Sequence, residues 1–294
     1  MKKMTKYIAS AVLCLWLLPL NAFAKELVPV GQVIGLELQD NTVTVAAFDE
    51  ELGAASKDAG LAVGDRILKI DGREIRTAED VRKALEQSKG SITITVFRSG
   101  KEKFFRLSPE ITSDGPKLGI YLRQGVTGIG TVTYYDPDTG EFGTLGHGVN
   151  NSSGQLLNLA QGSAYDARVL TVRKGKSGEP GQLMGGIESR TPIGILRKNT
   201  AQGVFGSSAA GWEGQVIPVA ASNEIRTGKA VILSTIAGNE VREYSVEILK
   251  IYPKSRQNGR NLLLKVTDPA LLEGTGGIVQ GMGVSYNKDN QWNP

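Results

Sequence analysis

The stretch that decides the fold of the N-terminal half is Ala59-Gly60-Leu61-Ala62-Val63-Gly64-Asp65-Arg66-Ile67-Leu68-Lys69-Ile70-Asp71-Gly72. It places a glycine turn before a short apolar strand and an Asp-Gly turn after it. On either side, Thr42–Val45 and Ile92–Val96 are β-branched runs with a period of two, which predicts two more strands. Thr77 is a suitable N-cap for a helix that ends near Gly90. Residues 26–109 are therefore predicted to form a small α+β domain.

Composition limits the kinds of function that the chain can have. The 294 residues are 40% hydrophobic and 22% charged, which is typical of a soluble globular protein with one large or two ordinary domains. One histidine and one cysteine are too few for a His/Cys zinc site, so we expect neither a metal nor a cofactor. Without the three lysines near the start, 31 basic residues face 30 acidic ones, which gives no case for a nucleic-acid partner.

The first 24 residues have the pattern of an export signal. Lysines at the start are followed by an apolar run over residues 7–20 and by Ala22-Phe23-Ala24. We expect export across the cytoplasmic membrane, with cleavage after Ala24 or retention as a membrane anchor through the apolar run. The only cysteine, Cys14, lies inside that run, so a cleaved chain has no thiol and suits an oxidising compartment.

The C-terminal part, residues 112–294, is predicted to be an all-β barrel or sandwich after a turn-rich linker at Ser113–Pro116. Short β-rich runs recur there between glycine and Asp/Asn turns. His147 lies between two glycines, which leave backbone room around a side chain able to accept and return a proton. Taken alone, such a histidine is more often an ordinary surface residue, and Asp268 before Pro269 more often simply begins a turn.

The stretch described first resembles the PDZ domain family through Gly60, Gly64, Asp65, Ile67, Ile70, Asp71 and Gly72. In that family an extended peptide adds a strand to a sheet edge, and backbone amides of a glycine loop hold its carboxylate. The resemblance implies a peptide site made of Gly31, Gly35, Leu36, Glu37, Leu38, Val81 and Leu85, with Gly35 and Leu36 nearest the carboxylate. The loop departs from the common PDZ pattern, so an internal segment or the protein's own tail is an alternative ligand. A purely structural role in a small core is a further alternative.

The segment Val266-Thr267-Asp268-Pro269-Ala270-Leu271-Leu272-Glu273-Gly274-Thr275-Gly276-Gly277-Ile278-Val279-Gln280-Gly281-Met282, with the Gly-His turn and the PDZ-like domain before it, resembles the stage IV sporulation protein B peptidases. The resemblance implies a mainly β chain in which a PDZ domain precedes a chymotrypsin-like double β-barrel with serine endopeptidase activity. It implies that His147 is the general base, that Asp268 orients it, and that Gly281 and position 283 belong to the oxyanion loop.

The same resemblance implies a partner and a location. The expected substrate is a protein that restrains an intramembrane protease, within a membrane-associated regulatory complex, so that its cleavage leads to late sigma factor activation. The chain's own N-terminal region is a further expected substrate. The expected location is the space between the forespore and mother-cell membranes of an endospore-forming bacterium.

One departure bears on activity. The family continues after Gly-Met with Ser-Gly-Ser-Pro and uses the first serine as nucleophile, whereas this chain has Gly283-Val284-Ser285. Glycine has no attacking atom, and Ser285 is about 7 Å further along an extended backbone, so it is a poor replacement. The tail after Met282 is polar without a strand pattern, which predicts a second barrel that is incomplete at its C-terminal end.

Several functions therefore stay open. The leading expectation is an inactive, truncated or frame-altered member of the peptidase family. The alternatives are a non-catalytic exported module in which the PDZ domain recruits a peptide, an enzyme with an unexpected nucleophile, and an exported structural protein.

Overall fold

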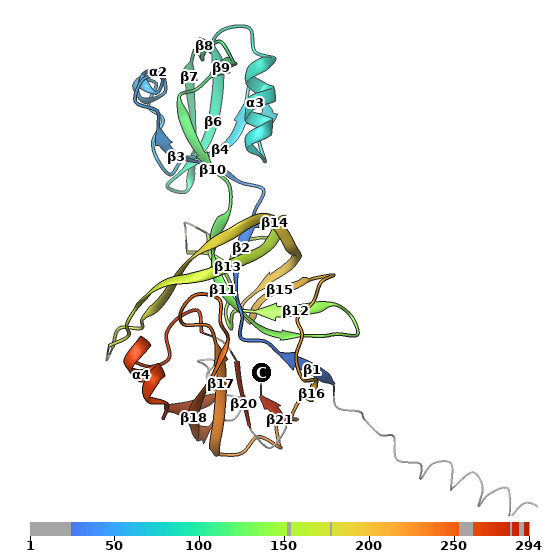
Figure 1. Ribbon diagram of the computed structural model, residues 1–294. Coiled ribbons are helices and arrows are strands. Elements are labelled where there is room, and N and C mark those ends of the chain that lie inside the picture. The colour runs from blue at the N-terminus through green and yellow to red at the C-terminus, as the bar shows by residue number, and fades with distance from the viewer. Residues whose placement is uncertain are drawn as a thin grey trace, which may run out of the picture.

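The computed structural model describes residues 25–151, 154–176, 178–252, 261–282, 284–287 and 291–293, with only the backbone given for the last two ranges. An α+β domain, a β-barrel and a second β-sheet follow one another along the molecule (Figure 1). The predicted export signal, residues 1–24, lies outside the described residues. Within the part that the structure describes, no helix is both long and apolar enough to cross a membrane.

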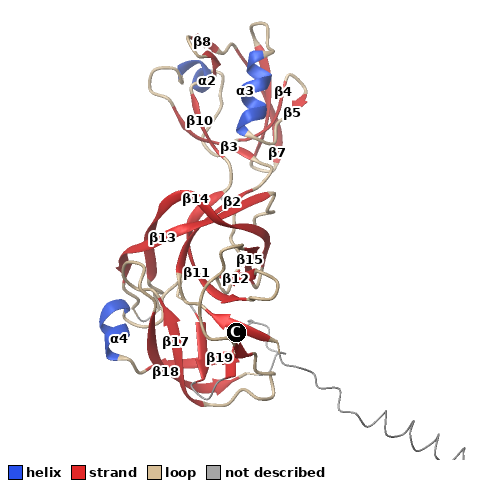
Figure 2. Cartoon of the chain, turned by 45° about the vertical axis from the view of Figure 1, so that its right-hand side comes forward, coloured by secondary structure: helices blue, strands red, loops and turns tan. Residues whose placement is uncertain are grey.

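The α+β domain, called the inserted domain below, spans residues 43–123. Its elements are β3 (Val43–Phe48), α2 (Ala54–Asp58), β4 (Arg66–Ile70), β5 (Arg73–Glu74), α3 (Ala78–Glu86), β6 (Ile92–Arg98), β7 (Lys101–Leu107), β8 (Glu110–Thr112), β9 (Gly115–Lys117) and β10 (Ile120–Arg123). The main sheet has the strand order β10-β3-β4-β6-β7, and α3 lies beside it (Figure 2). Val81 and Leu85 of α3 are buried in the core of this domain. The Thr77 side chain accepts a hydrogen bond from the Asp80 amide, so α3 begins where its cap predicts.

A closed barrel of six strands forms the centre of the molecule. Its strands are β2 (Val33–Gln39), β11 (Val126–Tyr135), β12 (Glu141–Thr144), β13 (Gln161–Arg173), β14 (Gln182–Thr200) and β15 (Gly203–Ser207), and β1 (Glu26–Pro29) and β16 (Ile217–Pro218) extend it. The order is β12-β15-β14-β13-β2-β11, and pairing of β11 with β12 closes the ring. Phe142, Ile34 and Leu38 are among the fully buried side chains that fill its interior. Closure leaves no free edge among these six strands.

Before β1, Lys25 is held against the barrel. Its Nζ lies 2.7 Å from Oδ2 of Asp136, whose side chain is almost completely buried. Burial alone would raise the pKa of Asp136, but the hydrogen bonds from Lys25, Thr139 and the Asp138 amide outweigh it and hold the pKa below its usual value. Asp136 is therefore ionised at neutral pH and ties β1 to the turn after β11.

The second sheet contains β17 (Gly228–Ser234), β18 (Arg242–Ile251), β19 (Leu262–Val266), β20 (Val284–Asn287) and β21 (Gln291–Asn293), with α4 (Pro269–Thr275) between β19 and β20. The order is β19-β18-β17-β20-β21, an open sheet in the described part of the chain rather than a closed barrel. The prediction that the tail after Met282 has no strands is wrong, because β20 pairs with β17 and β21 pairs with β20. These two strands are short and mostly polar, so the sequence of the tail lacks the alternation of apolar and polar residues that indicates a strand.

The predicted domain boundaries, 26–109 and 112–294, differ from the structure. Strand β2 pairs with β11 on one side and β13 on the other, so it belongs to the barrel. The domain at 43–123 is inserted between two adjacent barrel strands. Ser113–Pro116 belongs to the β8–β9 hairpin rather than to a linker: Ser113 and Asp114 form the turn, and Gly115 and Pro116 begin β9. The prediction placed residues 31–38 in a peptide-binding loop. Local sequence carries no signal for the partners of β2, which lie about 90 residues away in β11 and about 125 residues away in β13.

Candidate functional site

A cavity of about 380 Å³ lies between the barrel and the loop that follows α4. The barrel contributes His147 with its neighbours and the start of β14, and the loop contributes Gln280 and Gly281. The structure therefore brings together His147 and Gly281, which are 134 positions apart in the chain, as the resemblance implies.

His147 stands on a turn that the barrel holds in place. Thr144 Oγ1 and the Leu145 amide both donate to the Thr131 carbonyl, at 2.7 and 3.2 Å. Leu145 has a φ of 64°, a left-handed conformation that is uncommon for a bulky residue and is found where the surroundings enforce it. His147 is exposed, and its Nδ1 lies 3.0 Å from the Gly148 carbonyl. The tautomer that donates from Nδ1 leaves Nε2 free to accept a proton.

The glycine loop after α4 is fixed to the barrel at three points. The Gln280 amide donates to Gly181 at 3.0 Å, and the Leu183 amide donates to the Gln280 carbonyl at 3.1 Å. The buried Thr131 hydroxyl donates to the Gly281 carbonyl. Thr131 thus positions both the histidine turn and the glycine loop. Sequence reasoning missed it, since its only local signal is a small hydroxyl side chain in an apolar strand.

Asp268 does not take the role that the resemblance implies. Its carboxylate caps α4 by accepting a hydrogen bond from the Leu271 amide at 3.0 Å, and it also accepts one from the Ser245 amide of β18 at 3.4 Å. It does not line the cavity with His147, and none of the hydrogen bonds between described residues joins the two side chains. The amides in the first turn of a helix have no partner within the helix, and an aspartate before a proline at the helix start accepts a hydrogen bond from one of them. The carboxylate of Asp268 is engaged in this way.

This arrangement makes a prediction about Asp268. Asp268→Ala should lower the free energy of unfolding by about 1 kcal/mol, because α4 loses its N-cap. Asp268→Asn should cost much less, since asparagine caps equally well but cannot stabilise an imidazolium. Thermal denaturation measures both variants. Equal destabilisation by Asn and Ala would show that the negative charge, rather than the cap, is what matters at this position.

Of the two positions considered for the nucleophile, the structure describes only Ser285. Gly283 lies outside the described residues. The backbone of Ser285 lies in β20, where it is paired with Ile232 of β17. Ser285 is therefore part of a strand of the second sheet, not of the loop that reaches the cavity through Gly281.

The expected peptide-carboxylate loop, Gly31 to Leu38, is also corrected by the structure. Gly35, Leu36, Glu37 and Leu38 lie in β2 of the barrel, and Gly31 precedes that strand. A Cβ on Gly35 would meet Ile187 Cγ1 at 2.4 Å, so this glycine permits close packing within the barrel instead of ligand binding. Leu36 and Leu38 line the His147 cavity, and Glu37 accepts hydrogen bonds from Gln39 and Tyr165.

A groove in the inserted domain lies between α3 and β10. Its volume is about 360 Å³, and Val81 and Leu85 line its helical wall as expected. Strand β10 pairs with β3 on one side and ends the sheet on the other, where an extended chain can add. The preceding segment lines the same groove; it consists of the end of β9 and the two residues before β10 and is called the Pro116–Gly119 loop below. A Cβ on Gly119 would meet the Leu52 carbonyl oxygen at 2.1 Å, and φ is 62°, so only glycine fits. Sequence reasoning looked for this loop before the first strand and missed it.

The described residues contain no group of three or more His, Cys, Asp or Glu side chains that could hold a metal ion.

Comparisons with known proteins match this architecture. The family model for SpoIVB peptidase S55 matches residues 114–290, and a PDZ domain model matches residues 51–99. A putative zinc metalloprotease of Rhizobium meliloti is 29% identical over 140 residues, which cover 47% of this chain and 34% of that protein. Another, of Agrobacterium fabrum, is 37% identical over 99 residues, which cover 33% of this chain and 25% of that protein. The chain thus spans about a third or less of these curated relatives.

Among solved structures, the PDZ domain of the SdrC-like protein from Listeria monocytogenes is similar at 23% identity and a TM-score of 0.24. The match covers 28% of this chain and 87% of that one.

Proposed function

The chain belongs to the SpoIVB peptidase S55 family, and from this premise we propose that it binds a polypeptide without hydrolysing it. The groove of the inserted domain recruits the polypeptide, and the His147 cavity receives a segment of it. The observation that carries the proposal is Gly283, which stands where the family has its nucleophilic serine. Loss of that serine from a serine-protease site lowers turnover by about 10⁶.

The chemistry of the cavity supports a site without turnover. Acyl transfer needs a hydroxyl within about 3 Å of the base, and glycine supplies none. Among the described residues, no carboxylate is hydrogen-bonded to the base, and Asp268 caps α4 instead. His147 and the glycine loop still present polar groups that can hold a peptide backbone.

The finer proposal concerns location and partner. The leader-like residues 1–24 support export, and the family resemblance supports the space between forespore and mother-cell membranes. There the chain would bind the protein that restrains an intramembrane protease and shield it from cleavage. A competing enzyme function through Ser285 is disfavoured by the pairing of that residue with Ile232 inside a sheet.

A fluorophosphonate probe tests the absence of a reactive serine. We expect no labelling of the full chain and no cleavage of casein. Labelling that disappears in Ser285→Ala and in His147→Ala would overturn the proposal and establish an active enzyme. Gly283→Ser is labelled in parallel for comparison with the wild type. This change places a hydroxyl at the position of the family's nucleophile without altering the binding groove.

A matched pair of variants tests peptide recruitment. Peptides with free C-termini are selected on the full chain from a random displayed library, and their affinities are then measured. Ala78→Tyr, which fills the mouth of the groove, should abolish binding, whereas Lys83→Tyr on the same helix outside the groove should not. Failure to select any peptide would contradict the proposal.

A further inference from the structure

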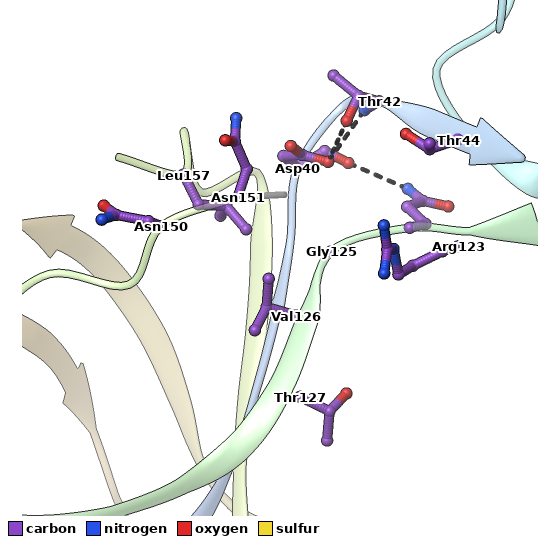
Figure 3. A pocket seen from close by; sticks show the side chains of 11 residues that line it. Asp40, Thr42, Thr44, Arg123, Gly125, Val126, Thr127, Asn150, Asn151 and Leu157 are labelled. Carbon is purple, nitrogen blue, oxygen red and sulfur yellow. Dashed lines mark hydrogen bonds between the residues drawn. The ribbon is translucent and has the colours of Figure 1, made fainter. Parts of the chain in front are cut away.

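A third cavity, of about 460 Å³, lies at the junction between the inserted domain and the barrel. Thr42, Thr44 and Arg123 lie on its side toward the inserted domain, and Asn150, Asn151 and Leu157 lie across from them (Figure 3). Neither the family chemistry nor the groove accounts for this cavity, which is the largest of those described above.

Along the chain, the junction cavity lies between the two sites already described. It shares Val126 and Asn150 with the His147 cavity. On the other side its lining begins at Arg123, and the groove lining ends at the adjacent Leu122. The groove and the junction cavity share no lining residue, but the three linings together include every residue from Gly119 to Gly128, along β10 and the start of β11.

The groove gives a bound chain a direction. A chain that adds antiparallel to β10, with its carboxylate at the Pro116–Gly119 loop, has its upstream residues beside Arg123. The N-terminus of α3 lies at this same end, because the Ala78 amide donates to Gln124 Oε1 at 3.3 Å. At about 3.3 Å per residue, Arg123 is reached about three to five residues before the C-terminus, and the His147 cavity about eight to ten before it.

The charges in the junction cavity select for an acidic residue. Arg123 is exposed, and no ion pair between described residues involves it. The carboxylate in the cavity, Asp40, is buried and accepts hydrogen bonds from the amide and hydroxyl of Thr42, at 3.2 and 2.7 Å. The charge that a ligand meets is thus the guanidinium, which binds carboxylates in a bidentate manner.

We propose that the junction cavity is a separate subsite that binds an acidic side chain of the recruited polypeptide through Arg123. One continuous chain then occupies the groove, the junction cavity and the His147 cavity in turn. This inference rests on the proposed peptide binding and adds the sequence class of the ligand. It needs no hydrolysis.

The displayed library, with random peptides of about sixteen residues, tests the inference on the full chain. We expect an apolar last residue and enrichment of Asp or Glu about three to five positions before it. Arg123→Ala should weaken the selected peptides by about ten-fold or more, and Arg123→Glu should select Lys or Arg there instead. Arg106→Glu, an exposed change on β7 away from the three cavities, should leave the selection unchanged.

The outcomes separate the inference from the function on which it rests. Failure to select any peptide contradicts both. Selection of an apolar C-terminus without upstream acidic residues, or equal affinity in wild type and Arg123→Ala, overturns the subsite and leaves groove binding intact. A selected peptide with a photoreactive side chain about nine positions upstream should crosslink beside His147, and crosslinking confined to the inserted domain would also overturn it.

Discussion

Asp65→Ala is expected to destabilise the inserted domain by about 3 to 5 kcal/mol, the largest effect of a single change in that domain. The Asp65 carboxylate is fully buried and pairs with Arg98, whose Nη2 also donates to the Gly60 carbonyl at 2.8 Å. Arg98 donates hydrogen bonds to this carboxylate, and they raise the pKa of Arg98. A guanidinium is protonated with or without a partner, so Asp65→Ala leaves a charged Arg98 without its carboxylate. The Ala62 amide, 2.9 Å from Asp65 Oδ2, also loses its acceptor.

Hydrogen exchange of the β4 and β6 amides in the full chain measures this loss. Asp114→Ala is the matched control, because Asp114 forms an exposed pair with Lys117 that is worth little. Exchange in Asp65→Ala as slow as in Asp114→Ala would show that the buried pair does not hold the glycine turn. Peptide binding should fall with the fold, since the same sheet carries β10.

Phe142→Ala is expected to destabilise the barrel by about 3 to 5 kcal/mol. Phe142 is the largest of the fully buried side chains in the described part of the chain. The centroid of its ring lies 5.2 Å from that of Trp212, and the two ring planes form an angle of 67°. Gly194 and Gly206 leave room for it, because a Cβ on either would come within 3.1 Å of the phenyl ring. Truncation opens a cavity whose glycine walls have no side chains with which to fill it.

Thermal denaturation followed by tryptophan fluorescence measures this change. Phe104→Ala removes the same number of atoms from a side chain that is 67% exposed, so it should change stability by no more than about 0.5 kcal/mol. Similar melting temperatures for the two variants would contradict the placement of Phe142 at the centre of the barrel.

Local signals were enough to predict α3 and the strands around it. Thr77 satisfies the first amides of the helix, and residues 92–96 alternate as a strand, because both effects act over a few neighbouring residues. The assignment of β2 failed for the opposite reason. Its partner in β11 lies beyond the whole inserted domain, as Leu38 pairs with Val126, and alternation alone does not identify a partner.

The candidate site was likewise predicted in part and missed in part. The resemblance placed His147 and Gly281 together, and one cavity contains both. The resemblance did not imply that the Asp268 carboxylate caps α4, where it accepts a hydrogen bond from the Leu271 amide. The groove loop at Pro116–Gly119 was missed because the order of elements in this domain places its edge strand last.

The insertion of one domain between two neighbouring barrel strands has a mechanical consequence. The chain crosses the boundary twice, at Asp40 and at Gln124, and Gln124 Nε2 lies 3.2 Å from the Asp40 carbonyl. The inserted domain is thus joined to the barrel through two neighbouring chain segments, which are hydrogen-bonded to each other. Grafting a short turn between these two points should give a barrel that folds by itself, whereas excising residues 26–109 would remove the barrel strand β2 together with β1 and leave β10 behind.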